Sequence, residues 1–381
     1  MTKRLRLLLL LPHLGGGGAE RVFELLAQHL PAERYELHLG LVTKSSEIRD
    51  EIPRSVTIHR LGASRVRAGS LGLLCLVWRL KPDVVLSNMA HLNFLVLLLR
   101  ILFPRRTRVL VRQNGTVSRM LCDSQSPRMT RTLYRLLYRR ADTVLCQSAA
   151  MALDLARDTE VRPEKIAILP NPVDIKAIRA TVSQSGCRWS GPGPHLLFVG
   201  RLAPEKGADL LLSAFARLLQ KVPTADLTLA GTGSEEAKLR QQVHALGLEG
   251  AVRFPGYASA PAAYYVGASL FVLPSRHEGM PNALLEAAAG GLPIVTTPAS
   301  DGLLELVQGQ PGVWVANGIS SGALEEALTT ALNAIRPGQR YEHSWIQPFE
   351  LVNALARYQA VIDDAANGTA HAEFSECTLR Y

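Results

Sequence analysis

The chain has 381 residues, of which 47% are hydrophobic and 20% are charged. That length favours two domains over one, and the apolar content is ample for full cores, so extensive disorder is excluded. The formal net charge of +9 is uneven, because residues 1–175 hold 27 Lys and Arg against 15 Asp and Glu. A basic first half indicates an anionic partner. No nucleic-acid-binding motif accompanies it, so we expect no nucleic acid among the partners.

The cysteine pattern and the N-terminus both indicate a soluble protein. Five cysteines are scattered without a C-x-x-C pair, which favours reduced thiols in a cytosolic protein over disulfides or a structural metal. Basic residues precede an apolar run at 7–11, but the run is too short for a signal peptide and a glycine-rich turn follows it. No apolar run approaches the length of a membrane span.

The first half alternates strands with helices. A continuous apolar run at 5–11 is typical of an inner parallel strand; a glycine turn and an amphipathic helix at about 19–30 follow it. This order lets a backbone approach a phosphate, although the contiguous glycines do not fit the spaced G-x-G-x-x-G fingerprint. A helical stretch is expected at 71–80, and further strands are expected at 37–42, 57–61, 84–87, 109–112, 143–147 and 166–169. Alternation of strands and helices predicts a parallel sheet covered by helices.

Polar residues follow two of these strands, at the end where open α/β sheets bind ligands. His91 comes shortly after the strand at 84–87, and Gln113 and Asn114 come directly after the strand at 109–112. A single histidine near an apolar helix is more often structural than functional. Both interpretations of His91 therefore stay open on the residues alone.

A basic amphipathic helix is predicted near residue 130. Its arginines recur at helical spacing with leucines between them, which gives a basic face and an apolar face. An ordinary surface helix and a patch for anionic lipid or a lipid diphosphate fit this pattern equally. The arginines are Arg128, Arg131, Arg135, Arg139 and Arg140.

The second half begins after a Ser-, Gly- and Pro-rich stretch at 181–194 that we interpret as a linker. Arg201 and Lys206 flank a Pro/Gly turn at the end of a strand at 195–199. Together the bidentate guanidinium of Arg201 and the point charge of the Lys206 ammonium are suited to bind a diphosphate. The alternative is an ordinary solvated basic turn. Further elements are expected as strands at 226–230, 252–254, 270–273, 292–297 and 313–315 and as helices at 209–221, 303–307, 321–334 and 349–362.

Two carboxylates follow the strand at 270–273: Glu278 in a loop and Glu286 on a helix over 283–289, with seven residues between them. Pro281 suits the first position of that helix, and two glycines end it. The helix N-terminus favours a phosphate, and a carboxylate accepts hydrogen bonds from a sugar or ribose diol. For either Glu taken alone a structural explanation is favoured, Glu278 as a cap of the helix and Glu286 as a solvated helix residue.

The spacing of Glu278 and Glu286 resembles the paired-glutamate signature of retaining GT-B glycosyltransferases, in particular family 4. Three further stretches resemble motifs of that family in the same order: 17–20, 171–174 and 200–207. The resemblance implies an α/β GT-B fold, in which two Rossmann-like parallel-sheet domains face each other across a cleft. Residues 1–180 would form the acceptor-side domain, completed by a C-terminal helix at about 341–364. Residues 195–340 would form the nucleotide-sugar domain, and 365–381 a flexible tail.

The resemblance also implies roles for individual residues. Glu286 would accept bonds from the ribose, Glu278 from the sugar hydroxyls, and Arg201 and Lys206 would hold the diphosphate. The catalytic residues implied are His91, Glu278, Arg201 and Lys206. The donor-binding residues implied are Gly17, Gly18, Gly231, Gly256, Tyr257, Gly279, Met280, Pro281, Asn282 and Glu286, with Gln113 and Asn114 on the acceptor side.

The expected reaction follows from the same resemblance. A nucleotide-diphosphate sugar, with UDP as the expected nucleotide, would glycosylate a glycan or a polyprenyl-diphosphate-linked acceptor in cell-surface polysaccharide biosynthesis. The sequence contains no D-x-D triplet, the usual site of a divalent metal in such enzymes, so we expect no metal. No cofactor is expected besides the nucleotide-sugar co-substrate. The basic first half would contact an anionic membrane surface, which places the protein in the cytoplasm as a peripheral protein on the inner face of a bacterial membrane.

Other classes of protein remain possible at this stage. A nicotinamide-dependent oxidoreductase requires spaced glycines that the chain lacks. A non-catalytic nucleotide-sugar or lipid-binding adaptor would need a decayed site, which the intact Glu and basic residues disfavour. A sugar-nucleotide epimerase or a phosphorylase would share the fold class.

Overall fold

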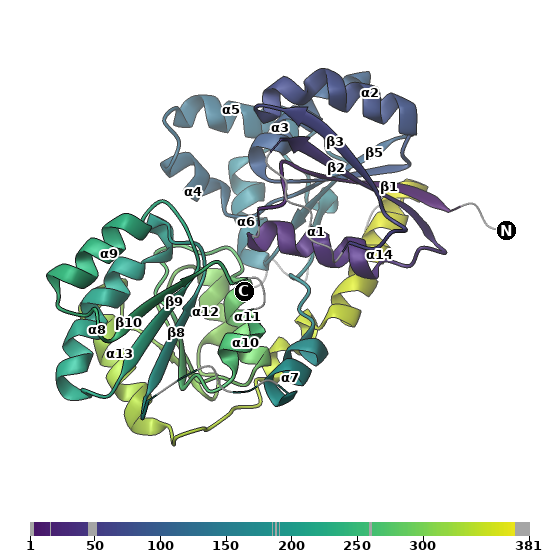
Figure 1. Ribbon diagram of the computed structural model, residues 1–381. Helices are drawn as coiled ribbons and strands as arrows, with labels where there is room; N and C mark the ends of the chain where they lie inside the picture. The colour runs from purple at the N-terminus through teal and green to yellow at the C-terminus, as the bar shows by residue number, and fades with distance from the viewer. Residues whose placement is uncertain are drawn as a thin grey trace. The chain divides into compact units, whose positions relative to one another are not determined.

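The computed structural model describes residues 4–15, 17–44, 52–184, 186, 189, 191–258 and 261–369. These residues form two compact units (Figure 1). The first unit contains the chain up to Pro172 and the C-terminal helix from Val352 onward, and the second unit is Val173–Leu351. Each unit is built on one sheet of parallel strands, as the alternation of elements predicts.

The sheet of the first unit has the strand order β3-β2-β1-β4-β5-β6-β7. Its inner strand β1 is an unbroken apolar run from Leu7 to Leu11 that is buried on both faces, as is typical of parallel strands. The strands are β1 Leu5–Leu11, β2 Tyr35–Thr43, β3 Thr57–Ala63, β4 Val84–Asn88, β5 Arg108–Arg112, β6 Thr143–Cys146 and β7 Ile166–Ile168.

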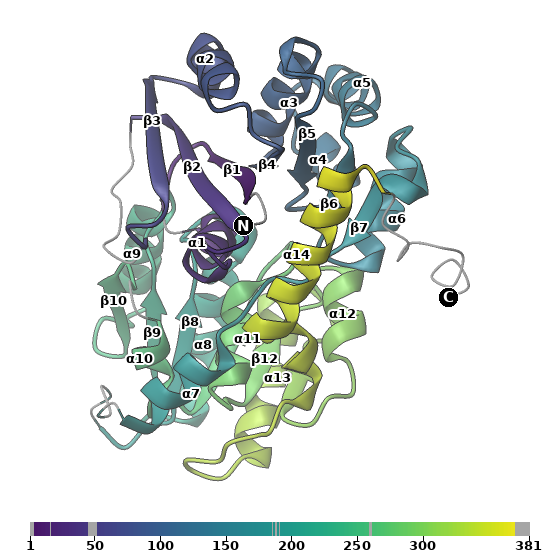
Figure 2. The same ribbon diagram turned by 90° about the vertical axis from the view of Figure 1, so that its right-hand side faces the viewer.

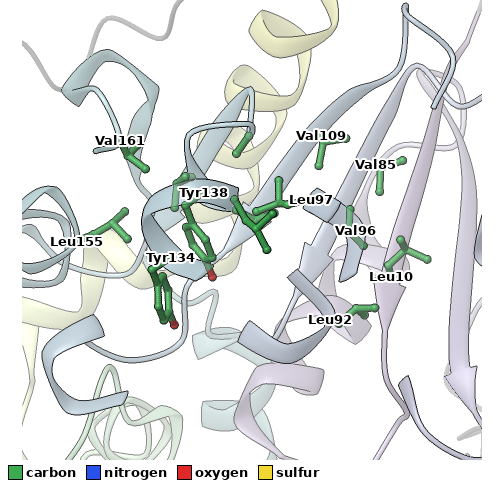
Figure 3. Packing of buried hydrophobic residues seen from close by; sticks show 14 of the residues in the cluster. Leu10, Val85, Leu92, Val96, Leu97, Val109, Tyr134, Tyr138, Leu155 and Val161 are labelled. Atoms are coloured by element: carbon green, nitrogen blue, oxygen red, sulfur yellow. The ribbon is translucent and has the colours of Figure 1, made fainter. Parts of the chain in front are cut away.

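Helices cover both faces of this sheet. Figure 3 shows the packing on one face, where side chains of the strands, such as Leu10 and Val109, meet Val96 of α3 and Tyr138 of α5. Figures 1 and 2 both show α1 and α14 side by side, away from α2, α3 and α5. The main helices of the unit are α1 Gly18–His29, α2 Ser70–Leu80, α3 Ala90–Leu99, α4 Val117–Cys122, α5 Pro127–Tyr138, α6 Ala149–Asp158 and α14 Leu351–Asn367.

The second unit has the strand order β10-β9-β8-β11-β12-β13. The helices α8, α9 and α13 share one apolar cluster with the sheet, and α7, α10, α11 and α12 share the other. The strands are β8 His195–Val199, β9 Asp226–Ala230, β10 Val252–Gly256, β11 Leu270–Leu273, β12 Ile294–Thr296 and β13 Val313–Val315. The helices are α7 Ile175–Gln184, α8 Ala208–Lys221, α9 Glu236–Ala245, α10 Ala262–Tyr265, α11 Asn282–Ala289, α12 Asp301–Val307 and α13 Ser321–Ala334.

Each sheet contains one point at which the strand order reverses. In the first unit the chain moves outward from β1 to β3 and then returns to the other side of β1 with β4. In the second unit the same reversal separates β8 from β11. The connections that leave the carboxyl ends of these two strands diverge, which creates the crevice where open α/β sheets bind ligands. The loops after β1, β4, β8 and β11 are therefore where a functional site is expected.

The boundary between the units differs from the sequence prediction of 1–180 and 195–340. It lies at Pro172, because Val173 already pairs with the end of the second unit. The N–H of Val173 donates to the carbonyl of Phe349, and its own carbonyl accepts from Leu351, at 2.8 and 2.9 Å. The predicted linker at 181–194 is likewise wrong at its start, because residues 181–184 complete α7.

The chain returns to the first unit at Val352 instead of at about residue 341, since the preceding turn Ser344–Phe349 belongs to the second unit. The predicted tail at 365–381 begins too early, because α14 continues to Asn367. Its remainder from residue 370 lies outside the described residues. Pro281 occupies the cap position before α11 and not the first helical position.

Candidate active site

The two loops at the reversal point of the second unit are joined by an ion pair. Lys206, in the loop after β8, donates from Nζ to both carboxylate oxygens of Glu278, in the loop after β11, at 2.7 and 2.9 Å. The hydroxyl of Ser275 adds a third hydrogen bond to Glu278 Oε1 at 2.6 Å. The Glu278 side chain is only 6% exposed. Glu278, which is expected near the sugar, is thus held in position by Lys206, which is expected near the diphosphate.

A second ion pair holds the same two loops together. Arg276 donates from Nη1 and Nη2 to the two oxygens of Asp209 on α8, at 2.7 and 2.6 Å, and Nη1 also donates to the Pro204 carbonyl at 2.8 Å. The bidentate bonds from Arg276 hold the pKa of Asp209 below its ordinary value. The loops also touch through their backbones, because a Cβ at Gly207, which has φ of +64°, would overlap the Pro274 carbonyl oxygen. Sequence reasoning missed this pair, since its members are 67 positions apart.

Arg201 lies on the surface of the same loop. Its side chain is 70% exposed, and Nη2 donates to Glu205 Oε1 at 3.0 Å. The prediction that Arg201 and Lys206 converge on one anion is therefore not met in this conformation, because each cation has a different carboxylate partner. An exposed ion pair such as Arg201–Glu205 contributes little energy, so it opposes reorientation of the guanidinium only weakly.

Glu286 is held by a buried tyrosine. Tyr265, on α10, donates from its hydroxyl to Glu286 Oε2 on α11 at 3.0 Å. Burial, reinforced by the negative charge of Glu286, raises the pKa of Tyr265 well above its ordinary value. The phenol consequently remains a donor at any physiological pH and orients the carboxylate. Sequence reasoning missed Tyr265, because a tyrosine in a short helix carries no signal that distinguishes a core residue from a ligand to a catalytic group.

The other predicted donor-binding residues of the second unit lie at the carboxyl end of the same sheet. Gly231 follows β9 with φ of +156°, and a Cβ there would overlap the Gly200 carbonyl oxygen, so the loops after β8 and β9 approach at a distance that only glycine permits. Gly256 ends β10 with φ of +81°, and the next residue, Tyr257, is exposed. The loop that enters α11 contains Gly279, Met280, Pro281 and Asn282.

In the first unit, side-chain amides link the loops at the reversal point. Gly17 caps α1 and Gly18 is its first residue. Asn88, at the end of β4, donates from Nδ2 to the Ala19 carbonyl at 2.8 Å and accepts at Oδ1 from Asn114 Nδ2 at 2.6 Å. The glycine turn, the end of β4 and the loop after β5 are thereby held in one hydrogen-bond network.

Gln113 and Asn114 differ in what they present to a ligand. Gln113 is buried, and its amide bonds internally: Nε2 to Tyr134 Oη at 3.1 Å, and Oε1 from Tyr138 Oη at 2.8 Å. It therefore supports the loop, with its amide turned away from solvent, whereas Asn114 is half-buried. Arg112, which sequence reasoning passed over, is fully buried and donates to Asn114, to Asn171 Oδ1 and to Tyr358 Oη.

His91 lies on the first turn of α3 and lines a cavity of about 880 Å³ within the first unit. Desolvation of the ring, together with the positive charge of the nearby His13, holds the pKa of His91 below its ordinary value. The imidazole is consequently neutral at pH 7. Its position at the carboxyl end of β4 agrees with the expected location, while its role in the reaction stays a prediction.

No three His, Cys, Asp or Glu side chains gather into a potential metal site in the part of the chain that the structure describes. A membrane-spanning helix is also missing from that part, since none there is both long and apolar enough.

Comparison with known proteins covers both units. Residues 16–177 match the family model "Glycosyltransferase Family 4", and residues 193–334 match "Glycosyl transferases group 1". An N-acetylgalactosamine-N,N'-diacetylbacillosaminyl-diphospho-undecaprenol 4-alpha-N-acetylgalactosaminyltransferase of Campylobacter jejuni is 29% identical over 77% of this chain and 80% of its own. The lipopolysaccharide core biosynthesis glycosyltransferase LpsE of Rhizobium meliloti is 27% identical over 84% of this chain and 87% of its own.

The fold is shared with a solved structure, Anabaena HepE in complex with UDP and glucose. That structure superposes with a TM-score of 0.77 at 19% identity, over 94% of this chain and 100% of its own. The two parallel-sheet units, together with the two matched domains, define a glycosyltransferase of GT-B fold. The chain belongs to glycosyltransferase family 4. The predicted family, fold class and enzyme class are thereby confirmed.

Proposed function

We propose that this enzyme is a retaining glycosyltransferase that moves a sugar from a UDP-linked donor to a lipid-diphosphate-linked glycan during cell-surface polysaccharide synthesis. The observation that carries the proposal is the Lys206–Glu278 pair at the reversal point of the second unit, beside a Glu286 that Tyr265 orients. The named relatives support the choice of substrates. HepE was solved with UDP and glucose, and the C. jejuni relative acts on a diphospho-undecaprenol compound.

The donor would bind through an exchange of partners at Lys206. An ammonium has three donors, of which two face Glu278 in this structure, so a diphosphate can bind the third and then compete for the others. Each bond that moves to the diphosphate frees an oxygen of Glu278 to accept from a sugar hydroxyl. Arg201 swings from Glu205 to complete the clamp. Glu286 then accepts from the ribose hydroxyls.

The chemical step requires stabilisation of the nucleoside diphosphate as the glycosidic bond breaks. Lys206 and Arg201 supply positive charge where that negative charge develops, so we expect turnover without a divalent metal. Glu278 is unsuited to act as a nucleophile, because its oxygens accept from Ser275 and, in the proposed donor complex, from the sugar hydroxyls. We infer that the acceptor hydroxyl attacks on the face that the diphosphate leaves. Its proton passes to the departing phosphate oxygen, and the anomeric configuration is retained.

The membrane would be approached through the basic face of α5. Arg131, Arg135 and Arg139 are exposed, and the carboxylates nearest to Arg131 and Arg139 lie at 3.6 and 3.9 Å, too far for strong pairs. Anionic lipid would therefore meet little competition for these guanidinium groups. Replacing all three by Gln should lower partitioning onto vesicles that contain anionic lipid, measured by co-sedimentation. Unchanged partitioning would rule out this face as the contact.

The proposal is tested by measuring release of nucleoside diphosphate from a panel of UDP-, GDP- and ADP-sugars in the presence of EDTA. Release from a UDP-sugar, lost in Glu286→Ala and slowed in Arg201→Ala, is expected. NMR of the released sugar or of the glycoside product would give the anomeric configuration. Dependence on added Mg²⁺ would refute the metal-independent mechanism. Absence of both release and nucleotide-sugar binding would favour the non-catalytic adaptor.

A further inference from the structure

The cavity of the first unit has an apolar wall, part of which lies outside the hydrophobic core. Its volume of about 880 Å³ is in the range of small-molecule sites, roughly 300–1,000 Å³. The helices α3 and α5 provide most of that wall, through Phe94, Leu95, Leu98, Leu133, Leu136 and Leu137.

Both helices also pack on the core, and of the wall residues only Leu98 and Leu136 are outside the core cluster and not packed against it. Val96 and Leu97 of α3, and Tyr134 and Tyr138 of α5, pack toward the sheet (Figure 3). A surface helix normally carries polar residues on its outer side. Here Leu98 is 54% exposed and Leu136 is 46% exposed, and both line the cavity. An apolar surface of this kind that forms a concave wall indicates a ligand with an apolar part.

The rim of the cavity is positively charged. Arg65 and Arg67, which lie between β3 and α2, and Arg140, just after α5, are lining residues with exposed side chains. Across the described residues, none of these three arginines is within ion-pair distance of a carboxylate. His13 and His91 line the same cavity at the carboxyl ends of β1 and β4. An apolar hollow beside three guanidinium groups complements an amphiphile with a strongly anionic head.

We propose that this cavity binds the lipid end of a prenyl-diphosphate-linked acceptor, with its first isoprene units against α3 and α5 and its diphosphate on the three arginines. This inference rests on the proposed function, since it names the part of the acceptor that the first unit recognises. A free sugar or a nucleotide fits less well, because the wall that α3 and α5 provide is apolar. The position of the cavity at the carboxyl ends of β1 and β4 would place the attached glycan near the reactive end of the sheet.

The test uses soluble prenyl diphosphates as probes, with the full-length enzyme and saturating UDP so that the donor site is occupied. Calorimetric titration should detect farnesyl diphosphate binding at least about tenfold more tightly than dimethylallyl diphosphate, because the longer chain buries more apolar surface. Farnesol, which lacks the anionic head, should bind more weakly than farnesyl diphosphate. Equal affinities for the two diphosphates would overturn the proposal.

Two sets of variants separate the chain from the head. The double variant Leu98→Glu, Leu136→Glu changes exposed positions and should abolish the preference for the longer chain. Its matched control is Leu71→Glu, on α2, where the leucine is 75% exposed and does not line the cavity. The triple variant Arg65→Gln, Arg67→Gln, Arg140→Gln should weaken both diphosphates at least about tenfold.

The double variant Arg105→Gln, Arg106→Gln is the charge control, because both arginines are exposed and lie outside the cavity. Equal losses in the controls and in the cavity variants would overturn the proposal. UDP release from the donor is measured in parallel. Intact release without farnesyl diphosphate binding refutes the cavity and leaves the transferase, whereas prenyl diphosphate binding without release refutes the proposed function and leaves the cavity.

Discussion

Tyr265→Phe tests whether the orientation of Glu286 determines donor affinity. The change removes only the hydroxyl that donates to Glu286 Oε2 at 3.0 Å. A hydrogen bond to a charged group contributes about 1.5–3 kcal/mol. Because Glu286 is partly exposed, water replaces some of that bond, and we expect a loss of about 1–2 kcal/mol in donor binding, which is roughly 5- to 30-fold in KM. The value of kcat should change little, since the ribose contact is made in the ground state and the transition state alike.

The assay combines UDP titration by calorimetry with initial rates at varied donor concentration. Tyr264→Phe, the same change at the neighbouring position, is the matched control and should leave both quantities unaltered. The double variant Tyr265→Phe, Glu286→Ala should bind UDP no worse than Glu286→Ala alone, because the tyrosine acts through the carboxylate. Additive losses, or a normal KM in Tyr265→Phe, would refute the reasoning.

Three further predictions concern backbone approach, the ion pair and pH. Gly231→Ala should weaken UDP binding at least about tenfold, because its Cβ would displace the Gly200 carbonyl; calorimetry would detect this, and normal affinity would contradict the assigned close approach. Lys206→Met should lower the free energy of unfolding in urea by about 2–3 kcal/mol, since it leaves Glu278 buried without its cation. The double variant Lys206→Met, Glu278→Gln should regain stability but not turnover. Recovery of both quantities would argue against a catalytic role of Lys206 and Glu278. Burial lowers the pKa of His343 from 6.5, so the unfolded chain binds more protons and stability should fall as pH drops below about 6.5. Urea unfolding at pH 7.5 and 5.5 should show a smaller fall in His343→Gln than in the natural protein.

The parallel strands were the most predictable part of the fold. Strands buried on both faces are continuous apolar runs, so the ranges expected at 5–11, 195–199 and 270–273 agree with β1, β8 and β11. The boundary between the units was not predictable in this way. It depends on the pairing of Val173 with residues 349–351, and no local pattern reports a contact between positions so far apart in the chain.

The candidate site was predicted residue by residue but not as a set of contacts. Glu278 and Lys206 were assigned to the sugar and the diphosphate, and their bond to each other emerged only when the loops after β8 and β11 were placed side by side. Gln113 was expected to face the acceptor, yet it is the residue whose amide the two buried tyrosines of α5 hold. Side-chain direction in a loop is set by such tertiary partners, which residue type alone does not reveal.

The two reversal points share a topology but differ in the bonds that link their loops. This difference predicts that they respond differently to an anionic ligand. In the second unit an ion pair joins the loops. A diphosphate can bind the ammonium of Lys206 in place of the Glu278 carboxylate, because both groups are negatively charged. In the first unit the link runs through the amides of Asn88 and Asn114, and the guanidinium that donates to Asn114 is that of the buried Arg112, so an incoming anion cannot take over this link as it can take over Lys206. On the proposed function, donor binding should therefore rearrange the second unit locally, while the loops of the first unit stay fixed. The separation of a responsive site from a rigid one follows from the kind of bond that links each pair of loops, without reference to how the units are arranged.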